Sequence, residues 1–231
     1  TELRKQYATK DNDDKEVRLF YARLLLEQKQ YVAARDEFGR LLLQRPGSPE
    51  LAFAIALISL QLGEYDRAEK ELRQALSSND KNKDEDTLHY YLAQLGEAQK
   101  DDAGALKHYR QVNGGEHVYP SRLREAYLLN KSGKLDEARK VLNRIVAKDD
   151  TQRVQLLMIE SQFLRDAKLF GESFKILARG LEKFPDQPEL LYQSALIADK
   201  LDKPDTFEQL IRSLIKVEPD NAHSYNALGY S

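Results

Sequence analysis

The chain has 231 residues, of which 32% are charged, and its 36 basic and 38 acidic side chains leave a net charge of −2. This balance gives no electrostatic reason to expect binding to nucleic acid or to an anionic membrane surface. Cysteine is absent, which excludes disulfides, thiolate nucleophiles and cysteine-based zinc sites within this sequence and fits both the cytoplasm and a bacterial periplasm. No run reaches the roughly 18 consecutive apolar residues of a membrane-spanning helix.

One short motif recurs along the chain at nearly constant spacing. In the stretch LGEYDRAE, residues 62–69, Gly63 fits the left-handed end of one helix and Asp66 fits the capped start of the next. The position of Ala68 recurs at intervals of 34, 37, 33, 35 and 34 residues, at Ala34, Ala68, Ala105, Ala138, Ser173 and Phe207. A period near 34 is typical of the tetratricopeptide repeat (TPR), in which each unit is a helix A, a turn and a helix B.

The period predicts an all-α protein, a right-handed superhelical solenoid of tetratricopeptide repeats. Six units are expected, at about residues 15–48, 49–81, 86–118, 119–153, 154–187 and 188–221. Residues 1–14 are expected to form the second helix of a preceding repeat and its loop, and residues 222–231 the start of a seventh repeat. We therefore expect this sequence to be cut from a longer array at both ends.

A column of small residues supports the repeat assignment. The eighth position of each unit holds Ala22, Ala56, Ala93, Ala126, Ser161, Ala195 and Gly229. Helices A and B then approach until only a hydrogen or a methyl group fits between them. Glu125, Glu160 and Ser194 depart from the pattern at a position where the repeat consensus has leucine. Phe207 stands in place of alanine and Gly180 in place of a larger apolar residue, and we expect Phe207 to fill the space that Gly180 leaves.

No residue pattern supports catalysis, a metal site or a bound cofactor. The four histidines, His89, His108, His117 and His223, are never three or four residues apart and form no HExxH arrangement. His89 and His108 fall at core-edge positions of the third unit, where packed or half-exposed histidines are expected. Phosphate loops, dinucleotide fingerprints and nucleophile elbows are also missing. We predict a non-catalytic protein with no cofactor and no metal.

The functional prediction rests on the inner face of the A helices. In TPR units the second, fifth, ninth and twelfth positions face the groove, and here they carry aromatic, apolar and polar side chains. Aromatic anchors bury a large area at low entropic cost, and polar neighbours set the register of a bound peptide. Packing against adjacent repeats is the alternative role for several of them. The predicted peptide- or protein-binding groove consists of Arg23, Phe53, Leu57, Tyr90, Gln94, Tyr127, Asn130, Met158, Gln162, Arg165, Tyr192 and Asp199.

Beyond the repeat itself, the order of several segments resembles one family. The segments are RLFYARLLLEQKQYVAARDEF (18–38), HYYLAQ (89–94), HYRQV (108–112), KLDEAR (134–139), QRVQLLMIESQFLRDA (152–167) and NAHSYNALGYS (221–231). Together they resemble the large, LbcA-like TPR lipoproteins of proteobacterial outer membranes.

The resemblance implies a protein that faces the periplasm and is held at the outer membrane by a lipidated N-terminal cysteine, which would lie outside this sequence. It implies an adaptor that brings peptidoglycan hydrolases to a carboxyl-terminal processing protease. The expected partners are then proteins or peptides in the groove, with no nucleic acid and with membrane contact only through the anchor. Two alternatives stay open: a structural assembly factor of an envelope or secretion complex, and the recognition domain of a larger enzyme.

Overall fold

The computed structural model of the chain describes residues 15–79, 81 and 83–219. All regular secondary structure in these residues is α-helical, which confirms the all-α prediction. None of the described helices is long and apolar enough to cross a membrane. The helix predicted in residues 1–14 and the seventh repeat predicted from residue 222 lie outside the described residues.

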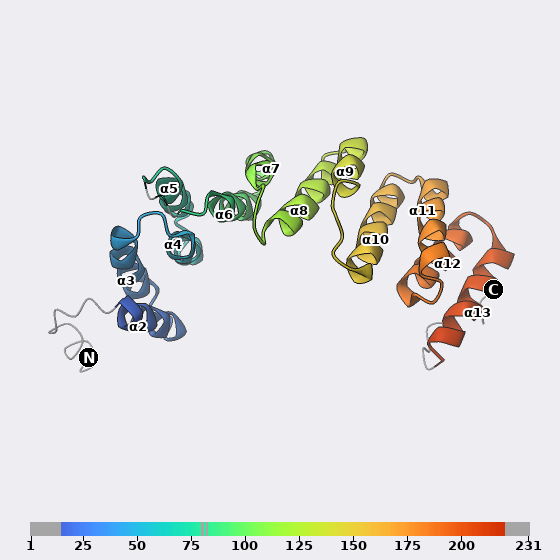
Figure 1. Cartoon of the computed structure of the whole chain (residues 1–231), viewed down its shortest axis with the longest axis horizontal. Coiled ribbons are helices and arrows are strands. Elements are labelled where there is room, and N and C mark those ends of the chain that lie inside the picture. Colours follow the sequence, from blue (N-terminus) through green and yellow to red (C-terminus); the bar gives the residue numbers. More distant parts are fainter. Residues whose placement is uncertain (1–14, 80, 82, 220–231) are drawn as a thin grey trace. The chain divides into compact units, whose positions relative to one another are not determined.

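The described helices follow one another in pairs, each with a helix A and a helix B joined by a short turn (Figure 1). The pairs are α2 (Lys15–Glu27) with α3 (Tyr31–Gln44), α4 (Pro49–Gln61) with α5 (Tyr65–Leu76), α6 (Glu85–Ala98) with α7 (Asp102–Gln111), α8 (Val118–Lys131) with α9 (Leu135–Leu142), α10 (Asp150–Asp166) with α11 (Phe170–Lys183), and α12 (Pro188–Lys200) with α13 (Pro204–Val217). Helix B also packs on helix A of the next pair, as α3 does on α4, α5 on α6 and α11 on α12.

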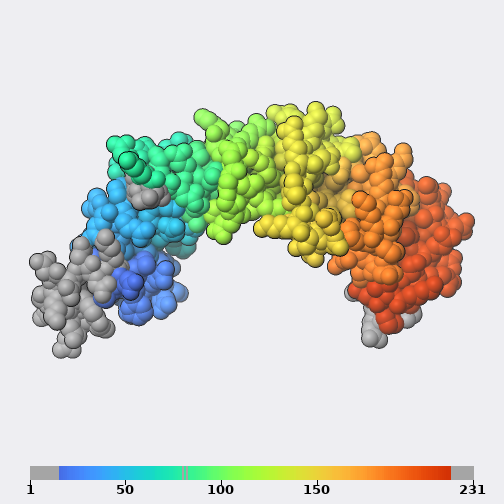
Figure 2. Space-filling model, in the orientation of Figure 1, coloured from blue at the N-terminus to red at the C-terminus, as the bar shows by residue number. Residues whose placement is uncertain are grey.

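The chain forms two compact units, Thr1–Arg124 and Glu125–Ser231. Among the described helices, unit 1 holds α2 to α7 with the first part of α8, and unit 2 holds the rest of α8 with α9 to α13. The space-filling view shows the helices of unit 1, coloured blue to green, packed closely against their neighbours (Figure 2).

The small-residue column lies where helices A and B touch. Its described members are at most 1% exposed: Ala22, Ala56, Ala93, Ala126, Ser161 and Ala195. Gly229 lies outside the described residues. In the pair α10–α11, the hydroxyls of Ser161 and Ser173 hydrogen-bond at 2.8 Å, so two serines replace the usual pair of methyl groups. In the pair α6–α7, a Cβ on Gly96 would lie 3.0 Å from the backbone nitrogen of Ala105, which leaves no room for a side chain.

The turn from helix A to helix B repeats one backbone geometry. In the second pair, the N–H of Gly63 donates to the carbonyl of Leu60 at 2.9 Å, and that of Glu64 donates to Ser59 at 2.8 Å. These bonds occupy carbonyls that the end of a helix leaves free. Gly63 has a φ of +75°, which confirms its predicted left-handed conformation. The residues with positive φ in the described turns between helices A and B are Lys29, Gly63, Lys100, Gly133, Lys168 and Asp202.

The predicted helix cap at Asp66 is wrong. Helix α5 begins at Tyr65, so Asp66 already lies in the first turn, and the N-cap residue is Glu64, whose side chain makes no capping hydrogen bond. The tight turn leaves only one residue between Gly63 and the helix, which moves the start ahead of Asp66. Asp66 instead places a negative charge near the positive end of the helix dipole. Side-chain caps do begin several A helices, at Ser48, Asp84 and Asp149.

The expected compensation between Gly180 and Phe207 is also wrong. A Cβ on Gly180 would lie 3.1 Å from the Cδ1 atoms of both Leu157 and Leu190, so these two leucines fill the space beside the glycine. Phe207 packs instead against the core of the last helix pair. The partners of Gly180 come from α10 and α12, the A helices on either side of α11.

Helix α9 is the shortest described helix. It has 8 residues, whereas the other B helices have 10 to 14. It ends at Leu142, and residues 143–149 have no regular structure. The β-branched neighbours Ile145 and Val146 have low helix propensity, which favours this early end. Ile145, which the sequence places on the apolar face of a longer helix B, lies beyond the helix and is half-buried.

Candidate protein-binding site

The predicted groove residues all keep some contact with solvent. Leu57, Tyr127 and Tyr192 are 48%, 51% and 38% exposed, although side chains of this kind usually bury most of their surface. Their apolar surface is therefore available to a partner. The exposed members of the set are Arg23, Leu57, Tyr127, Gln162, Tyr192 and Asp199, and the half-buried members are Phe53, Tyr90, Gln94, Asn130, Met158 and Arg165.

Four aromatic rings gather in unit 1. Phe53 of α4 stacks on Tyr91 of α6, with ring centroids 3.6 Å apart and planes 7° apart. Tyr90 stacks on His117, which directly precedes α8, with centroids 4.2 Å apart and planes 8° apart. The centroids of Tyr90 and Tyr91 lie 5.8 Å apart and so join the two stacks. We call Phe53, Tyr90, Tyr91 and His117 the aromatic cluster; it links three successive helix pairs through ring contacts.

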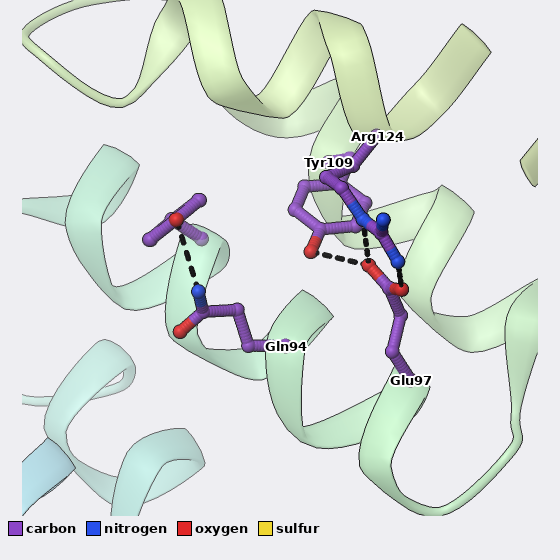
Figure 3. Close-up of polar contacts among 5 residues, drawn as sticks. Gln94, Glu97, Tyr109 and Arg124 are labelled. Carbon is purple, nitrogen blue, oxygen red and sulfur yellow. Dashed lines mark hydrogen bonds and ion pairs between the residues drawn. The ribbon is translucent and has the colours of Figure 1, made fainter. Parts of the chain in front are cut away.

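Polar and charged groups surround the aromatic cluster. The amide of Gln94, one turn after Tyr90, donates to the Tyr90 hydroxyl at 2.9 Å, so two predicted groove residues meet (Figure 3). Burial raises the pKa of Tyr91, and the negative charges of Glu50 and Glu116 raise it further. The phenol of Tyr91 therefore stays neutral at physiological pH.

A half-buried carboxylate fixes the helices beside the aromatic cluster. Glu97 of α6 accepts a hydrogen bond from the Tyr109 hydroxyl at 2.6 Å and one from Nε of Arg124 at 3.0 Å (Figure 3). Burial alone would raise the pKa of Glu97, but the hydrogen bonds from Arg124 and Tyr109 hold it below its usual value. Tyr109 is only 1% exposed, and its ring centroid lies 6.1 Å from that of Tyr90. The hydrogen bond between Tyr109 and Glu97 therefore also holds a buried ring in place next to the cluster.

Two members of the aromatic cluster are missing from the predicted groove. Tyr91 follows Tyr90 directly, and consecutive helical residues point about 100° apart. A selection of the groove-facing positions of each repeat therefore includes Tyr90 and omits Tyr91. His117 precedes α8, where no helical period applies. Arg23 and Leu57 are exposed, and among the described residues no ring contact or hydrogen bond joins either to the cluster.

In unit 2, predicted groove residues form a chain of hydrogen bonds across three A helices. Asn130 of α8 donates to one carboxylate oxygen of Asp166 at 3.1 Å, and Gln162 donates to the other at 2.5 Å. Arg165 of α10 donates to Gln162 and to Gln193 of α12. We call Asn130, Gln162, Arg165, Asp166 and Gln193 the polar network. It presents amide, carboxylate and guanidinium groups of the kind that pair with a peptide backbone.

The remaining groove residues of unit 2 divide between surface and core. Tyr127 of α8 and both Tyr192 and Asp199 of α12 are exposed. Met158 of α10 packs against the buried cluster that includes Val154, so contact with neighbouring helices occupies part of its side chain. Phe53 of unit 1 likewise packs against the core between α4 and α6.

Two histidines meet in unit 1. His89 of α6 and His108 of α7 lie with their Nδ1 atoms 2.9 Å apart, and both are half-buried. Burial lowers the pKa of His89, although the charges of Glu85 and Asp86 act in the opposite direction. Burial and the neighbouring His89 lower the pKa of His108 to about 4. Within the described residues no group of three or more His, Cys, Asp or Glu side chains is placed to hold a metal ion.

The comparisons with known proteins agree with this architecture. A family model for the tetratricopeptide repeat matches residues 2–58 and 25–95. The crystal structure of the C-terminal part of a TPR repeat-containing protein from Cytophaga hutchinsonii superposes with a TM-score of 0.64, covering 91% of this chain and 83% of that chain at 18% identity. The described part of this chain has the tetratricopeptide-repeat fold.

Two further comparisons cover different shares of the chain. The TPR repeat-containing protein PA4667 of Pseudomonas aeruginosa is 36% identical over 146 residues, which are 63% of this chain and 25% of that protein. The matched region thus spans a quarter of the length of this relative. A chain in the structure of Naa15/Naa10 bound to HypK-THB has a TM-score of 0.58 at 16% identity, covering 97% of this chain and 34% of that chain.

A TPR consensus position that usually holds leucine is polar here in three repeats. Glu125, Glu160 and Ser194 are 6%, 7% and 1% exposed, so each is buried as the leucine would be. Nε of Arg139 donates to Glu160 at 2.8 Å, and the same guanidinium reaches Glu172 at 3.2 Å. This arginine joins α9 to both helices of the next repeat, and the hydrogen bond to Glu160 raises its pKa.

Proposed function

We propose that the chain is a non-catalytic scaffold that binds proteins or peptides on the A-helix faces of its TPR units. The observation that carries the proposal is that these faces combine exposed apolar side chains with hydrogen-bonding groups: Leu57 and the aromatic cluster in unit 1, and Tyr127, Tyr192 and the polar network in unit 2. The aromatic rings would anchor a partner, and the amides would fix its register.

The specific role we propose is that of a periplasmic, outer-membrane-associated adaptor that presents substrates such as peptidoglycan hydrolases to a carboxyl-terminal processing protease. Two observations support it. The order of several sequence segments resembles that of LbcA-like lipoproteins, and the chain shares 36% identity with the Pseudomonas aeruginosa protein over 146 residues.

The test is affinity purification from proteobacterial envelope extract with matched variants. The groove variant is Leu57→Ala with Tyr127→Ala, which alters one exposed residue in each unit. The control is Leu43→Ala with Tyr65→Ala, which removes the same side chains at B-helix positions that are 82% and 46% exposed. We expect the wild type and the control to recover a processing protease together with cell-wall hydrolases, and the groove variant to recover about tenfold less.

Other outcomes would change the proposal in different ways. Equal recovery by the groove variant and its control, with unchanged helical circular dichroism, would contradict binding on the A-helix faces. Recovery of a secretion or assembly machine that depends on the groove would leave the scaffold in place and replace the adaptor role by that of an assembly factor.

A further inference from the structure

A pocket opens in unit 2 at the place where α9 ends early. It has a volume of about 730 Å³ and lies between the end of α9, the segment that follows it, and the helices α10 and α11. This volume lies within the roughly 300–1,000 Å³ range of sites that hold a ligand or a group of side chains. We call it the α9–α11 pocket. Its apolar wall is formed by Leu142, Ile145, Leu156, Leu157, Ile176 and Phe184.

The early end of α9 explains why this apolar wall reaches solvent. The helix has 8 residues against 14 in α11 and α13, so it lacks nearly two turns at about 3.6 residues per turn. Leu156, Leu157, Ile176 and Phe184 are left half-buried. The pocket therefore corresponds to the missing end of a helix B.

The α9–α11 pocket is separate from the proposed groove. Leu157 and Glu160 line the pocket, whereas Gln162 and Arg165 of the same helix belong to the polar network. At about 100° per residue, the two sets are centred roughly 140° apart around α10. A partner bound in the pocket would not cover the polar network.

The rim of the pocket is predominantly basic. Arg139, Arg153, Arg179 and Lys183 line it, against Glu160 and Glu182. Arg139 forms an ion pair with Glu160, and Arg153 forms one with Asp150. Arg179 and Lys183 are exposed, lie one turn apart on α11, and form no ion pair with any residue of the described part of the chain. Two cations thus stand beside an apolar wall without internal partners.

We propose that the α9–α11 pocket docks a short α-helical segment of a partner protein that carries apolar side chains one turn apart and carboxylates beside them. The apolar side chains occupy the place of the missing turns of α9, and the carboxylates pair with Arg179 and Lys183. This interface is additional to the A-helix faces and does not depend on their proposed role.

The test is selection of short displayed peptides on the whole chain, followed by binding measurements with the enriched peptide. We expect enriched sequences with apolar residues three or four positions apart next to Asp or Glu. Arg179→Glu with Lys183→Glu should weaken their binding about tenfold, and a peptide with lysines in place of its carboxylates should bind this variant better than the wild type. The control, Lys175→Glu with Lys200→Glu, reverses two other exposed charges of unit 2 and should leave the affinity unchanged.

A second variant tests the location without altering charge. Ala147 lines the pocket from the irregular segment after α9, so Ala147→Trp should place an indole ring in the pocket, weaken peptide binding and keep the helical circular dichroism. Enriched peptides without a preference for Asp or Glu would overturn the proposal. So would peptide binding that neither the charge-reversal variant nor Ala147→Trp changes. Binding of laurate in place of any acidic peptide would overturn it in favour of a fatty acyl site. Leu57→Ala with Tyr127→Ala should leave pocket binding intact, which separates this proposal from the groove.

Discussion

At the scale of single residues, the contact between His89 and His108 makes part of the stability depend on pH. The two Nδ1 atoms are 2.9 Å apart, so only one hydrogen fits between them and at least one ring must be neutral in this geometry. In addition to His89, the cations Arg73 and Lys107 lower the pKa of His108, and Glu69 acts in the opposite direction. Protonation of both rings is therefore unfavourable in the folded chain.

We expect acid to destabilise unit 1 through this pair. The pKa of His108 falls from 6.5 to about 4 on folding, so between these values the unfolded chain binds more protons and the free energy of unfolding decreases as the pH falls. His108→Gln keeps a polar side chain but does not titrate. The melting temperature of this variant should therefore fall less than that of the wild type between pH 7 and pH 4.5. Parallel curves for the two proteins would contradict this role of the histidine pair.

At the scale of helices, one arginine holds α9 against the next repeat. Arg139 of α9 pairs with Glu160 of α10 and Glu172 of α11, and the side chain of Glu160 is only 9% exposed. An ion pair in this position stabilises mainly because Glu160 without Arg139 would be a buried, unpaired charge.

Arg139→Ala should therefore destabilise unit 2 by about 2 kcal/mol, below the usual cost of breaking a buried pair because the arginine is partly exposed. Arg139→Leu with Glu160→Leu removes both charges and restores the leucine of the TPR consensus, so it should recover most of the loss. Urea unfolding followed by circular dichroism measures both effects. If Glu160→Leu alone were as destabilising as Arg139→Ala, the cost would come from packing, not from an unpaired charge.

At the scale of the whole molecule, stability is expected to be local. The helix contacts within each unit run between neighbours along the chain, such as α4 with α5 and α5 with α6, or between successive A helices, such as α4 with α6. In such an array each repeat depends on its own core and on the faces next to it. A defect in one repeat should thus loosen its neighbours before it affects distant ones.

Leu72→Ala tests this locality. Leu72 is fully buried between α4, α5 and α6, so its truncation should cost about 2–5 kcal/mol in that region. Amide hydrogen exchange should become faster in α4, α5 and α6 and stay unchanged in α12 and α13. Uniform acceleration over all described helices would show a single cooperative unit and contradict the prediction.

The repeat period and the residue types at each turn decide most of the fold. The helix pairs, the buried small-residue column and the positive φ of Gly63 all follow from the sequence, because close helix packing and a left-handed turn admit few residue types. The cap at Asp66 does not follow, because the tight turn starts the helix before that residue. Lys100 adopts a φ of +62° without being a glycine, in a turn closed by backbone hydrogen bonds from Lys100 to Glu97 and from Asp101 to Gly96.

The sequence by itself determined which faces of the A helices carry aromatic and polar side chains, since a helical period fixes the face on which each residue lies. Only the tertiary structure decided which side chains meet. The stacking of Phe53 on Tyr91 and of Tyr90 on His117 joins different helix pairs, and the pocket beside α9 depends on where one helix ends. The physical reason is that a period describes directions within one helix, whereas contacts between helices depend on how far each extends and how closely its neighbours approach.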